Sequence, residues 1–261
     1  MANTLFVGKV YHRFDELSST NDYARDLLAK SKPPEGTVVQ AASQSAGRGQ
    51  FGSSWVSAPG ENLTLSVILY PKWLPVQAQF RLNEAVALAV RDTVAWGLES
   101  VLTPSLQVRI KWPNDIWIGS AKAAGILIQN TLKGTFLQAS IIGMGLNVNQ
   151  IVFPESAPNA ASLASVLGRP TGLDTCSERL CEFLEQRYLQ LKSGNATRLR
   201  AEYHQELFGM GAERYFERSG GGIFRGLIHG VSDDGRLQVV NEAGHTELFG
   251  LKEIKFLSGP L

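Results

Sequence analysis

The segment QSAGRGQFGSSW, residues 44–55, has the composition of a loop that binds an anion. Gly47, Gly49 and Gly52 have the G-x-G-x-x-G spacing of a dinucleotide-binding turn. Glycines let a backbone wrap closely around a ligand and point N–H groups at its oxygens. Arg48 lies between two of them, and its guanidinium is a fixed fork of donors for phosphate or carboxylate. The first question is therefore whether the anion is the pyrophosphate of NAD or FAD.

The residues after the loop argue against a dinucleotide. A Rossmann turn needs a strand before the glycines and a helix at the third glycine, whose N-terminus meets the pyrophosphate. TVVQAAS is typical of a strand, but SSWVSAPGENLTLSVIL has a Pro-Gly break and then β-branched alternation. There is no room for a crossover helix, so an NAD oxidoreductase is the least favoured interpretation. Taken alone, the loop is better explained as a hairpin with a solvated Arg48 and a core Trp55.

Two further motifs place lysines at the ends of expected strands. KWPNDIW sets Lys111 and Asp115 around a Trp-Pro-Asn break, which in isolation favours a surface ion pair. KAAGIL places Lys122 at a strand start, and Gly125 three residues later leaves space above the backbone. The glycine favours a ligand near a lysine that would otherwise face solvent.

A fourth motif, GMGLNVN, combines small residues with amides. Gly143 and Gly145 lie in the same strand phase as Asn147 and Asn149. Small residues followed by an amide suggest close approach of a ligand whose edge needs a donor and an acceptor.

The elements that must position these motifs belong to an α+β fold. Alternation predicts strands at residues 4–14, 37–43, 62–70, 106–112, 115–119, 122–130 and 135–149. Helical spacing predicts helices at residues 18–30, 79–98, 177–192 and 196–207. Short strands separated by Gly, Asp and Asn turns follow, at residues 214–218, 222–232, 236–241, 245–250 and 253–257. They predict a small β-barrel, and hence a catalytic domain at 1–210 and a barrel domain at 211–261.

The bulk composition excludes several classes of protein. The 261 residues are 44% hydrophobic and 19% charged, with 25 basic and 24 acidic residues and a formal charge of +1. This near-zero net charge gives no positive electrostatic field that would attract a nucleic-acid backbone, so DNA or RNA is disfavoured as a main partner. The start has no long apolar region and no apolar run approaches bilayer length, so we expect a cytoplasmic protein without a membrane span. Cys176 and Cys181 are separated by about 500° of helical rotation, which disfavours a disulfide or a metal pair.

In combination, the motifs resemble one family. SSTN, QSAGRGQFGSSW, KWPNDI, KAAGIL and GMGLNVN occur in the order and spacing of the biotin–protein ligases, that is, the biotin–[acetyl-CoA-carboxylase] ligases. The resemblance runs from Leu17 to Asn149 and rests on all five blocks, since any one alone would be weak. It implies a mixed β-sheet with flanking helices, similar to class II aminoacyl-tRNA synthetase cores, followed by a small SH3-like barrel.

The resemblance also implies a two-step reaction and its substrates. Biotin and ATP form biotinyl-5′-AMP and pyrophosphate, and the biotinyl group then passes to a lysine of a biotin carboxyl carrier protein. Mg²⁺ is expected with ATP, but no all-protein metal cage is visible, so the metal ligands stay unknown.

The same resemblance assigns roles to residues of this chain. Lys122 and Arg48 are implied as catalytic, because the carboxylate and the α-phosphate are both anions and must be neutralised and held in line. The implied biotin-binding residues are Ser19, Thr20, Asn21, Gln44, Gly47, Arg48, Gly49, Gln50, Lys122 and Gly125. The implied nucleotide-binding residues are Arg48, Trp55, Lys111, Asn114, Lys122 and Asn147. Asn21 has an alternative role as the N-terminal cap of the following helix.

Two features depart from the family. Gln50 and Ser53 occupy positions where arginines are common, so the loop carries one guanidinium instead of three. SSTN begins at Ser18, which leaves no room for the N-terminal DNA-binding domain of bifunctional members. We therefore expect no nucleic-acid partner. We also expect residues 46–53 to be mobile without biotin or ATP.

Two rival functions stay open at this point. A lipoate ligase or octanoyltransferase would use the same core, although the complete glycine loop favours biotin. A non-catalytic biotin or nucleotide sensor would not need both Lys122 and Arg48. The sequence leaves monomer and homodimer open.

Overall fold

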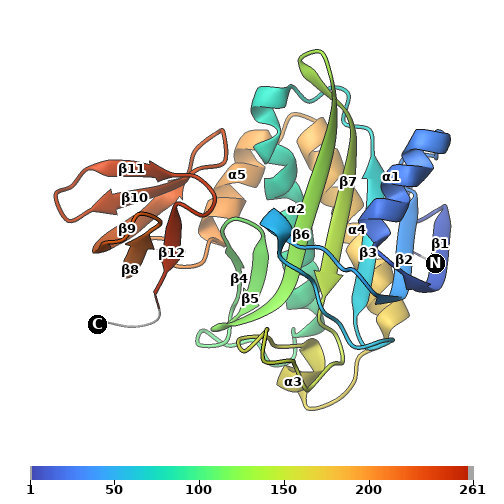
Figure 1. The fold of residues 1–261 in the computed structure, drawn as a ribbon, viewed down its shortest axis with the longest axis horizontal. Coiled ribbons are helices and arrows are strands. Elements are labelled where there is room, and N and C mark those ends of the chain that lie inside the picture. The colour runs from blue at the N-terminus through green and yellow to red at the C-terminus, as the bar shows by residue number, and fades with distance from the viewer. Residues whose placement is uncertain (1, 258–261) are drawn as a thin grey trace.

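A mixed sheet of seven strands forms the centre of the larger part of the chain. The structure is a computed structural model that describes residues 2–257. The strand order is β1-β2-β3-β7-β6-β5-β4 (Figure 1). The bounds are β1 (Tyr11–Leu17), β2 (Val38–Gln44), β3 (Leu63–Leu69), β4 (Val108–Lys111), β5 (Asp115–Ile118), β6 (Ala121–Lys133) and β7 (Phe136–Leu146). Only the β1–β2 pair among these described strands is parallel.

The predicted opening strand at residues 4–14 is wrong in its first half. Strand β1 begins at Tyr11, and residues 5–10 form turns and bends. The backbone N–H groups of Leu5, Phe6 and Val7 donate to the carboxylate of Glu185 instead of to a neighbouring strand. A long-range acid therefore satisfies this segment, and local alternation carries no sign of it.

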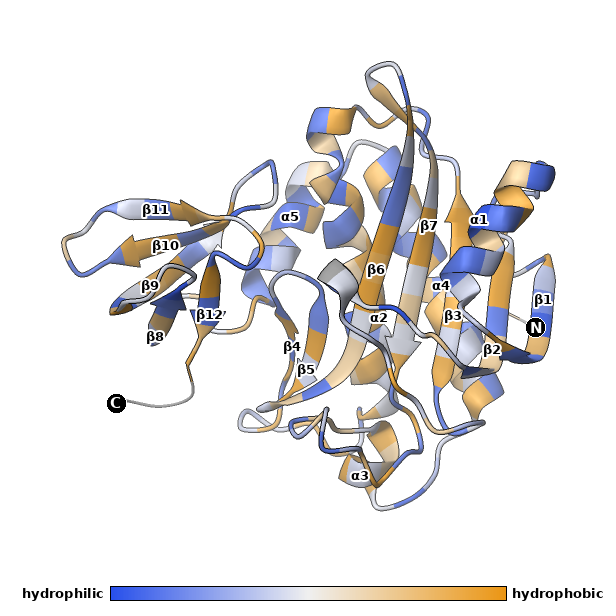
Figure 2. Cartoon of the chain, in the orientation of Figure 1, coloured by the Kyte–Doolittle hydropathy of each residue, from blue (hydrophilic) through white to orange (hydrophobic). Residues whose placement is uncertain are grey.

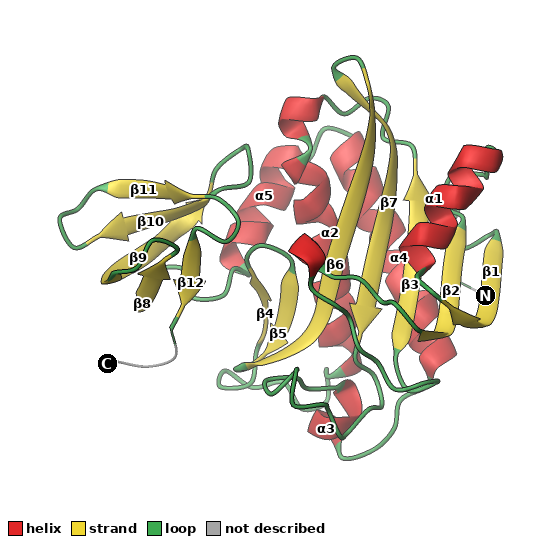
Figure 3. Cartoon of the chain, in the orientation of Figure 1, coloured by secondary structure: helices red, strands yellow, loops and turns green. Residues whose placement is uncertain are grey.

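Helices cover the two faces of the sheet unequally. Helices α2 (Phe80–Gly97) and α4 (Leu173–Lys192) lie behind the strands, and α1 (Thr20–Lys30) lies in front of them (Figure 3). Adjacent residues of β2 divide between two cores, since Val38 packs in the large core and Val39 under α1. Strand β3 is buried along its whole length and is mostly coloured as hydrophobic in Figure 2. The face beside α1 is left open for a site.

The short strands predicted after Gly211 form a second, antiparallel sheet. Its order is β11-β10-β9-β8-β12. The bounds are β8 (Glu213–Arg218), β9 (Ile223–Val231), β10 (Leu237–Asn241), β11 (Thr246–Phe249) and β12 (Ile254–Phe256). The expectation of an α+β fold with a mixed sheet and flanking helices is confirmed.

Helix α5 (Ala196–Gln205) and the residues after it join the two sheets. On the edge strand β4, the Ile110 N–H donates to the backbone carbonyl of Glu206, and the Ile110 carbonyl accepts from the N–H of Phe208. The Trp112 indole N–H donates to the Gly235 carbonyl, 2.9 Å away, in the turn between β9 and β10. The KWPND motif therefore contacts the second sheet.

The cysteines and the helices carry two smaller findings. Cys176 and Cys181 are free and buried on α4, and burial raises the pKa of the Cys181 thiol to about 12. None of the helices between residues 2 and 257 is both long and apolar enough to cross a bilayer.

Candidate active site

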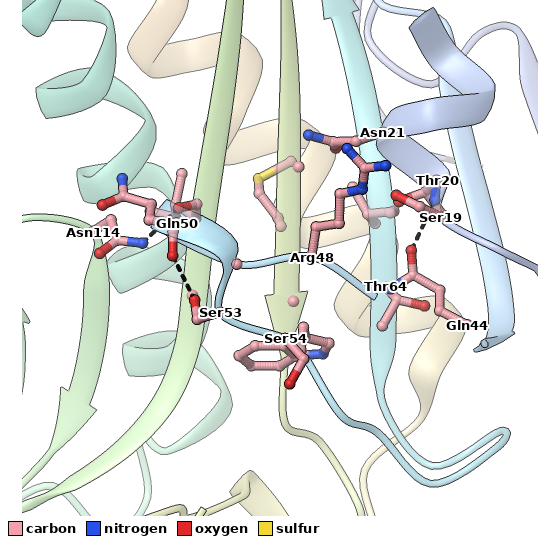
Figure 4. A pocket seen from close by; sticks show the side chains of 18 of the residues that line it. Ser19, Thr20, Asn21, Gln44, Arg48, Gln50, Ser53, Ser54, Thr64 and Asn114 are labelled. Atoms are coloured by element: carbon pink, nitrogen blue, oxygen red, sulfur yellow. Dashed lines mark hydrogen bonds between the residues drawn. The ribbon is translucent and has the colours of Figure 1, made fainter. Parts of the chain in front are cut away.

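A cavity of about 210 Å³ opens on the side of the sheet that carries α1. It lies between the start of α1, the glycine loop and strands β3, β6 and β7 (Figure 4). The predicted site residues that line it are Ser19, Thr20, Asn21, Gln44, Arg48, Gly49, Gln50, Trp55, Asn114, Lys122 and Gly125. All five sequence motifs therefore meet in this lining, since GMGLNVN contributes Gly143 and Gly145.

One end of the cavity is neutral and polar. The Thr20 N–H donates to Gln44 Oε1 at 2.8 Å, which joins α1 to the end of β2. The Ser66 hydroxyl lies 2.6 Å from Asn21 Oδ1 and 2.8 Å from Thr20 Oγ1. Hydroxyls and amides that are held in this way can donate to a carbonyl and accept from N–H groups.

Asn21 is part of this network and does not cap the helix. The N-cap of α1 is Ser19, whose hydroxyl accepts from the Asp22 N–H, so the capping alternative for Asn21 is wrong. Asn21 is buried above Gly143, where a Cβ atom would overlap its amide oxygen. Gly143 is therefore required for close approach of the Asn21 side chain.

The glycine loop is folded on itself. The Gly49 N–H donates to the Ser53 carbonyl at 2.7 Å, and the Trp55 N–H donates to the Gly47 carbonyl at 2.9 Å. Gly47 does not line the cavity itself, but a Cβ atom there would overlap the Trp55 carbonyl. A single 3-10 turn at Gln50–Gly52 stands where a Rossmann fold would begin its crossover helix. This agrees with the exclusion of a dinucleotide turn.

The Trp55 indole separates this cavity from a second one of about 250 Å³. The ring lies over Gly125 and Gly145, and a Cβ atom on Gly145 would overlap it. Trp55 and Lys122 line both cavities, whereas Asn147 lines only the second. The Asn147 amide donates to the Ala161 carbonyl at 3.1 Å. Five of the six predicted nucleotide-binding residues thus line one or both of two adjoining spaces: Arg48, Trp55, Asn114, Lys122 and Asn147.

Both catalytic candidates are paired with a carboxylate. Lys122 Nζ lies 2.7 Å from Asp115 Oδ1, and the side chains are 35% and 22% exposed. Arg48 Nη2 lies 2.8 Å from Asp22 Oδ2. Asp115 therefore pairs with Lys122 and not with Lys111, so the surface pair considered from the KWPNDIW motif alone is wrong.

Lys111 lies at the boundary between the two sheets. Lys111 is not among the described residues that line either cavity. Its ammonium is 3.7 Å from the centre of the Trp117 ring and 5.2 Å from that of Phe256. Burial lowers the pKa of Lys111 to about 8, although the Asp115 carboxylate opposes this shift. Its predicted contact with nucleotide stays a prediction.

Sequence reasoning missed several lining residues on β3, β6 and β7. Thr64, Leu65, Ile126 and Met144 line the cavity but look like ordinary strand residues. Thr64 lies directly opposite Gly145 across β3 and β7. Only the strand register, which local patterns do not give, would have indicated Thr64.

The site can bind an anion next to a neutral polar group. Its cations are Lys122 and Arg48, and Asp115 is the carboxylate that lines the first cavity among the described residues. Residues 2–257 contain no cluster of three or more His, Cys, Asp or Glu side chains suited to holding a metal ion.

Comparison with known proteins places this geometry in a family. The model of the Biotin/lipoate A/B protein ligase family matches residues 13–147. The bifunctional ligase/repressor BirA of Bacillus subtilis is 32% identical over 243 residues, which are 92% of this chain and 71% of that protein. The biotin–[acetyl-CoA-carboxylase] ligase of Mycobacterium tuberculosis is also 32% identical, over 88% of this chain and 84% of its own length.

A solved structure supports the fold. The biotin protein ligase of Aquifex aeolicus in complex with biotin and ATP aligns with a TM-score of 0.77 at 23% identity, covering 96% of this chain and 100% of that one. By the family match and the identities to its relatives, the chain belongs to the biotin/lipoate A/B protein ligase family, as its resemblance to the biotin–protein ligases predicted.

Proposed function

We propose that this chain is a biotin–protein ligase that activates biotin with ATP and transfers it to a lysine of a biotin carboxyl carrier protein. The observation that carries the proposal is the convergence of Lys122 and Arg48 on one cavity with a neutral polar end. The relatives named biotin–[acetyl-CoA-carboxylase] ligase favour acetyl-CoA carboxylase as the owner of the acceptor.

The neutral polar end suits the ureido ring of biotin. This ring offers N–H donors and a carbonyl acceptor, and Ser19, Thr20 and Gln44 offer the complementary groups. We assign Asn21 and Gly125 to the same pocket, with the backbone of Gly47, Gly49 and Gln50 closing over it. The side chains of Ser19, Thr20, Asn21 and Gln44 are uncharged, which suits a neutral ligand.

The charged end suits the activation step. A carboxylate oxygen of biotin attacks the α-phosphorus of ATP, the bond to the β-phosphate oxygen breaks, and pyrophosphate leaves. Lys122 neutralises both the carboxylate and the phosphate, and Arg48 binds the phosphate from the loop. Asp115 and Asp22 hold these cations at 2.7 and 2.8 Å before substrate binds. Incoming anions would take over part of this pairing.

The second cavity suits the nucleotide. Trp55 offers an aromatic face for the base, and Asn147 offers an amide for its edge. We assign Asn114 and Lys111 to the nucleotide as well. Mg²⁺ is proposed to arrive with ATP and to neutralise its phosphate oxygens, and Asp115 is the residue that would hold it.

Transfer needs no further cofactor. The neutral amine of the acceptor lysine attacks the acyl carbon of biotinyl-5′-AMP and an amide bond forms. The bond between the acyl carbon and the phosphate oxygen breaks, AMP leaves with that oxygen, and the amine gives up one proton to solvent. The mixed anhydride supplies the driving force that a free carboxylate lacks. The chain must therefore hold the intermediate until the acceptor arrives.

The finer architecture is also a proposal. We divide the chain into a catalytic domain at 1–210, related to class II aminoacyl-tRNA synthetase cores, and an SH3-like domain at 211–261. The five antiparallel strands β8–β12 support the second assignment. We place the protein in the cytoplasm, as a monomer or homodimer that does not act on nucleic acid.

Pyrophosphate release distinguishes the proposal from its rivals. We expect release with ATP and biotin, and none with ATP and lipoate or octanoate. Release with ATP and lipoate, but not with ATP and biotin, would favour a lipoate ligase. Biotin binding without any release would favour the sensor.

A further inference from the structure

The glycine loop is connected to helix α1 through one carboxylate. Asp22 lies in the first turn of α1, directly after SSTN, and its side chain is 16% exposed. Its Oδ2 atom is 2.8 Å from Arg48 Nη2, and its Oδ1 atom is 2.8 Å from Arg25 Nη2. Figure 4 shows the Arg48 side chain extending from the loop toward the start of α1.

The hydrogen bonds of the loop lie elsewhere. At its base, the N–H groups of Ser45 and Ala46 donate to the carbonyls of Leu17 and Ser18. Farther along, the Ser53 hydroxyl donates to the Gln50 carbonyl at 2.7 Å, within the loop. These bonds shape the loop and anchor its base. Among the described side chains of residues 47–53, the Arg48–Asp22 ion pair is the contact that joins this part of the loop to α1.

We infer that Asp22 is a positioning residue that keeps the glycine loop over the cavity by holding Arg48. The inference rests on the proposed function, because it explains how a loop with one arginine retains biotinyl-5′-AMP. Gln50 and Ser53 carry no charge that could bind either α1 or the phosphate. The single guanidinium therefore has to serve both the loop and the ligand.

The geometry allows this double use. The ion pair occupies Nη2 of Arg48, whereas a guanidinium has five N–H donors in a fixed plane. The remaining donors are available to a phosphate oxygen while Asp22 stays in place. Arg25 binds the other oxygen of Asp22, so the carboxylate keeps a partner if Arg48 moves.

The test compares Asp22→Ala with Asp26→Ala, an exposed acid one turn farther along the same helix. Hydrogen exchange of residues 46–53 without ligand measures loop opening, and rapid filtration measures release of biotinyl-5′-AMP. Because half-exposed ion pairs are weak, we expect Asp22→Ala to speed both by about threefold to fivefold. Asp26→Ala should change neither, and Asp22→Glu should restore most of the slow release.

A double-mutant cycle separates the tether from a general effect on α1. In an Arg48→Gln background, Asp22→Ala should leave loop exchange unchanged, since the pair is already broken. Melting temperatures check that every variant is folded. If Asp22→Ala does not fold, Asp22→Asn takes its place. Equal acceleration in both backgrounds would overturn the inference, as would no acceleration in the wild-type background.

The two proposals fail in different ways. If the wild type makes no biotinyl-5′-AMP, the proposed function fails, and unchanged loop exchange in Asp22→Ala would refute the tether separately. If the wild type makes the intermediate and Asp22→Ala releases it at the wild-type rate, only the tether fails.

Discussion

At the scale of single residues, each of the two cations of the site forms an ion pair with a carboxylate. Lys122 and Arg48 are each partly shielded from water and would lose solvation energy without a partner. Asp115 and Asp22 supply one carboxylate each. An anionic ligand that binds Lys122 or Arg48 therefore competes with the carboxylate that already pairs with that cation.

Lys122→Ala tests the central cation. We expect the rate of biotinyl-5′-AMP formation to fall about 10²- to 10³-fold, the typical loss for one donor that stabilises developing charge. Biotin binding by calorimetry should persist, because the neutral end of the cavity is intact. Lys133→Ala, an exposed lysine at the end of the same strand, is the control. Full activity in Lys122→Ala would remove this residue from the mechanism.

Gly145→Ala tests the position of Trp55. The added Cβ would overlap the indole, which must shift away from Gly145. Overpacking of this kind costs about 1–3 kcal/mol, so we expect the KM for ATP to rise about tenfold while biotin affinity changes less. Gly220→Ala is the control, since open space surrounds a Cβ there. An unchanged KM for ATP would place the nucleotide elsewhere.

Gln50→Arg tests the loop's missing charge. Gln50 lines the cavity, so an arginine there adds a donor for the phosphate of the intermediate. We expect slower release of biotinyl-5′-AMP in a rapid-filtration assay. Equal release from both forms would contradict the interpretation of Gln50 as a neutral substitute.

At the scale of elements, helices and strands were predictable wherever local pattern and tertiary contacts agree. Helix α1 follows its predicted range because Ser19 caps it and its apolar spacing covers a small core. The segment before Tyr11 was not predictable, since the acid that binds its N–H groups lies on α4. The surroundings of Lys111 were also not predictable, because the Phe256 ring that its ammonium contacts lies near the far end of the chain.

A buried acid links α2, α5 and the second sheet. Glu84 on α2 is fully buried beside Arg200 on α5, 3.1 Å away, and Arg200 donates to the Val231 carbonyl of β9. Burial raises the pKa of Glu84 from 4.5 to about 7, against the opposing charges of Arg200 and Arg81. The folded state therefore holds this proton more tightly than the unfolded state.

The sign of the pH dependence follows from this raised pKa. Glu84 contributes stability below pH 4.5, and this contribution is lost as pH rises toward 7. Glu84→Gln keeps a neutral side chain at every pH. The wild type should therefore lose stability relative to Glu84→Gln as the pH rises. The difference between their free energies of unfolding, measured by urea denaturation, should change by about 1–3 kcal/mol in favour of the variant between pH 5 and pH 8. Parallel pH profiles for the two proteins, with exposed Glu99→Gln as control, would contradict the assignment.

At the scale of the whole molecule, the site depends on motifs that the sheet brings together. The sequence indicated the residues of the cavity because five short blocks have one order and spacing. It could not indicate that Lys122 pairs with Asp115, or that Thr64 faces Gly145, because both depend on strand register. It also could not divide the predicted nucleotide-binding residues between two cavities, since the Trp55 ring that separates the cavities is placed by glycines on β6 and β7.

The most direct test of the proposed reaction uses the whole chain and its acceptor together. The protein is incubated with ATP, biotin, Mg²⁺ and a biotin-acceptor domain, and the intact mass of the acceptor is measured. We predict a mass gain of one biotinyl group that requires ATP, is lost in Lys122→Ala, and is absent when the acceptor lysine is replaced. An acceptor mass that stays unchanged with the wild-type chain would contradict the proposed function.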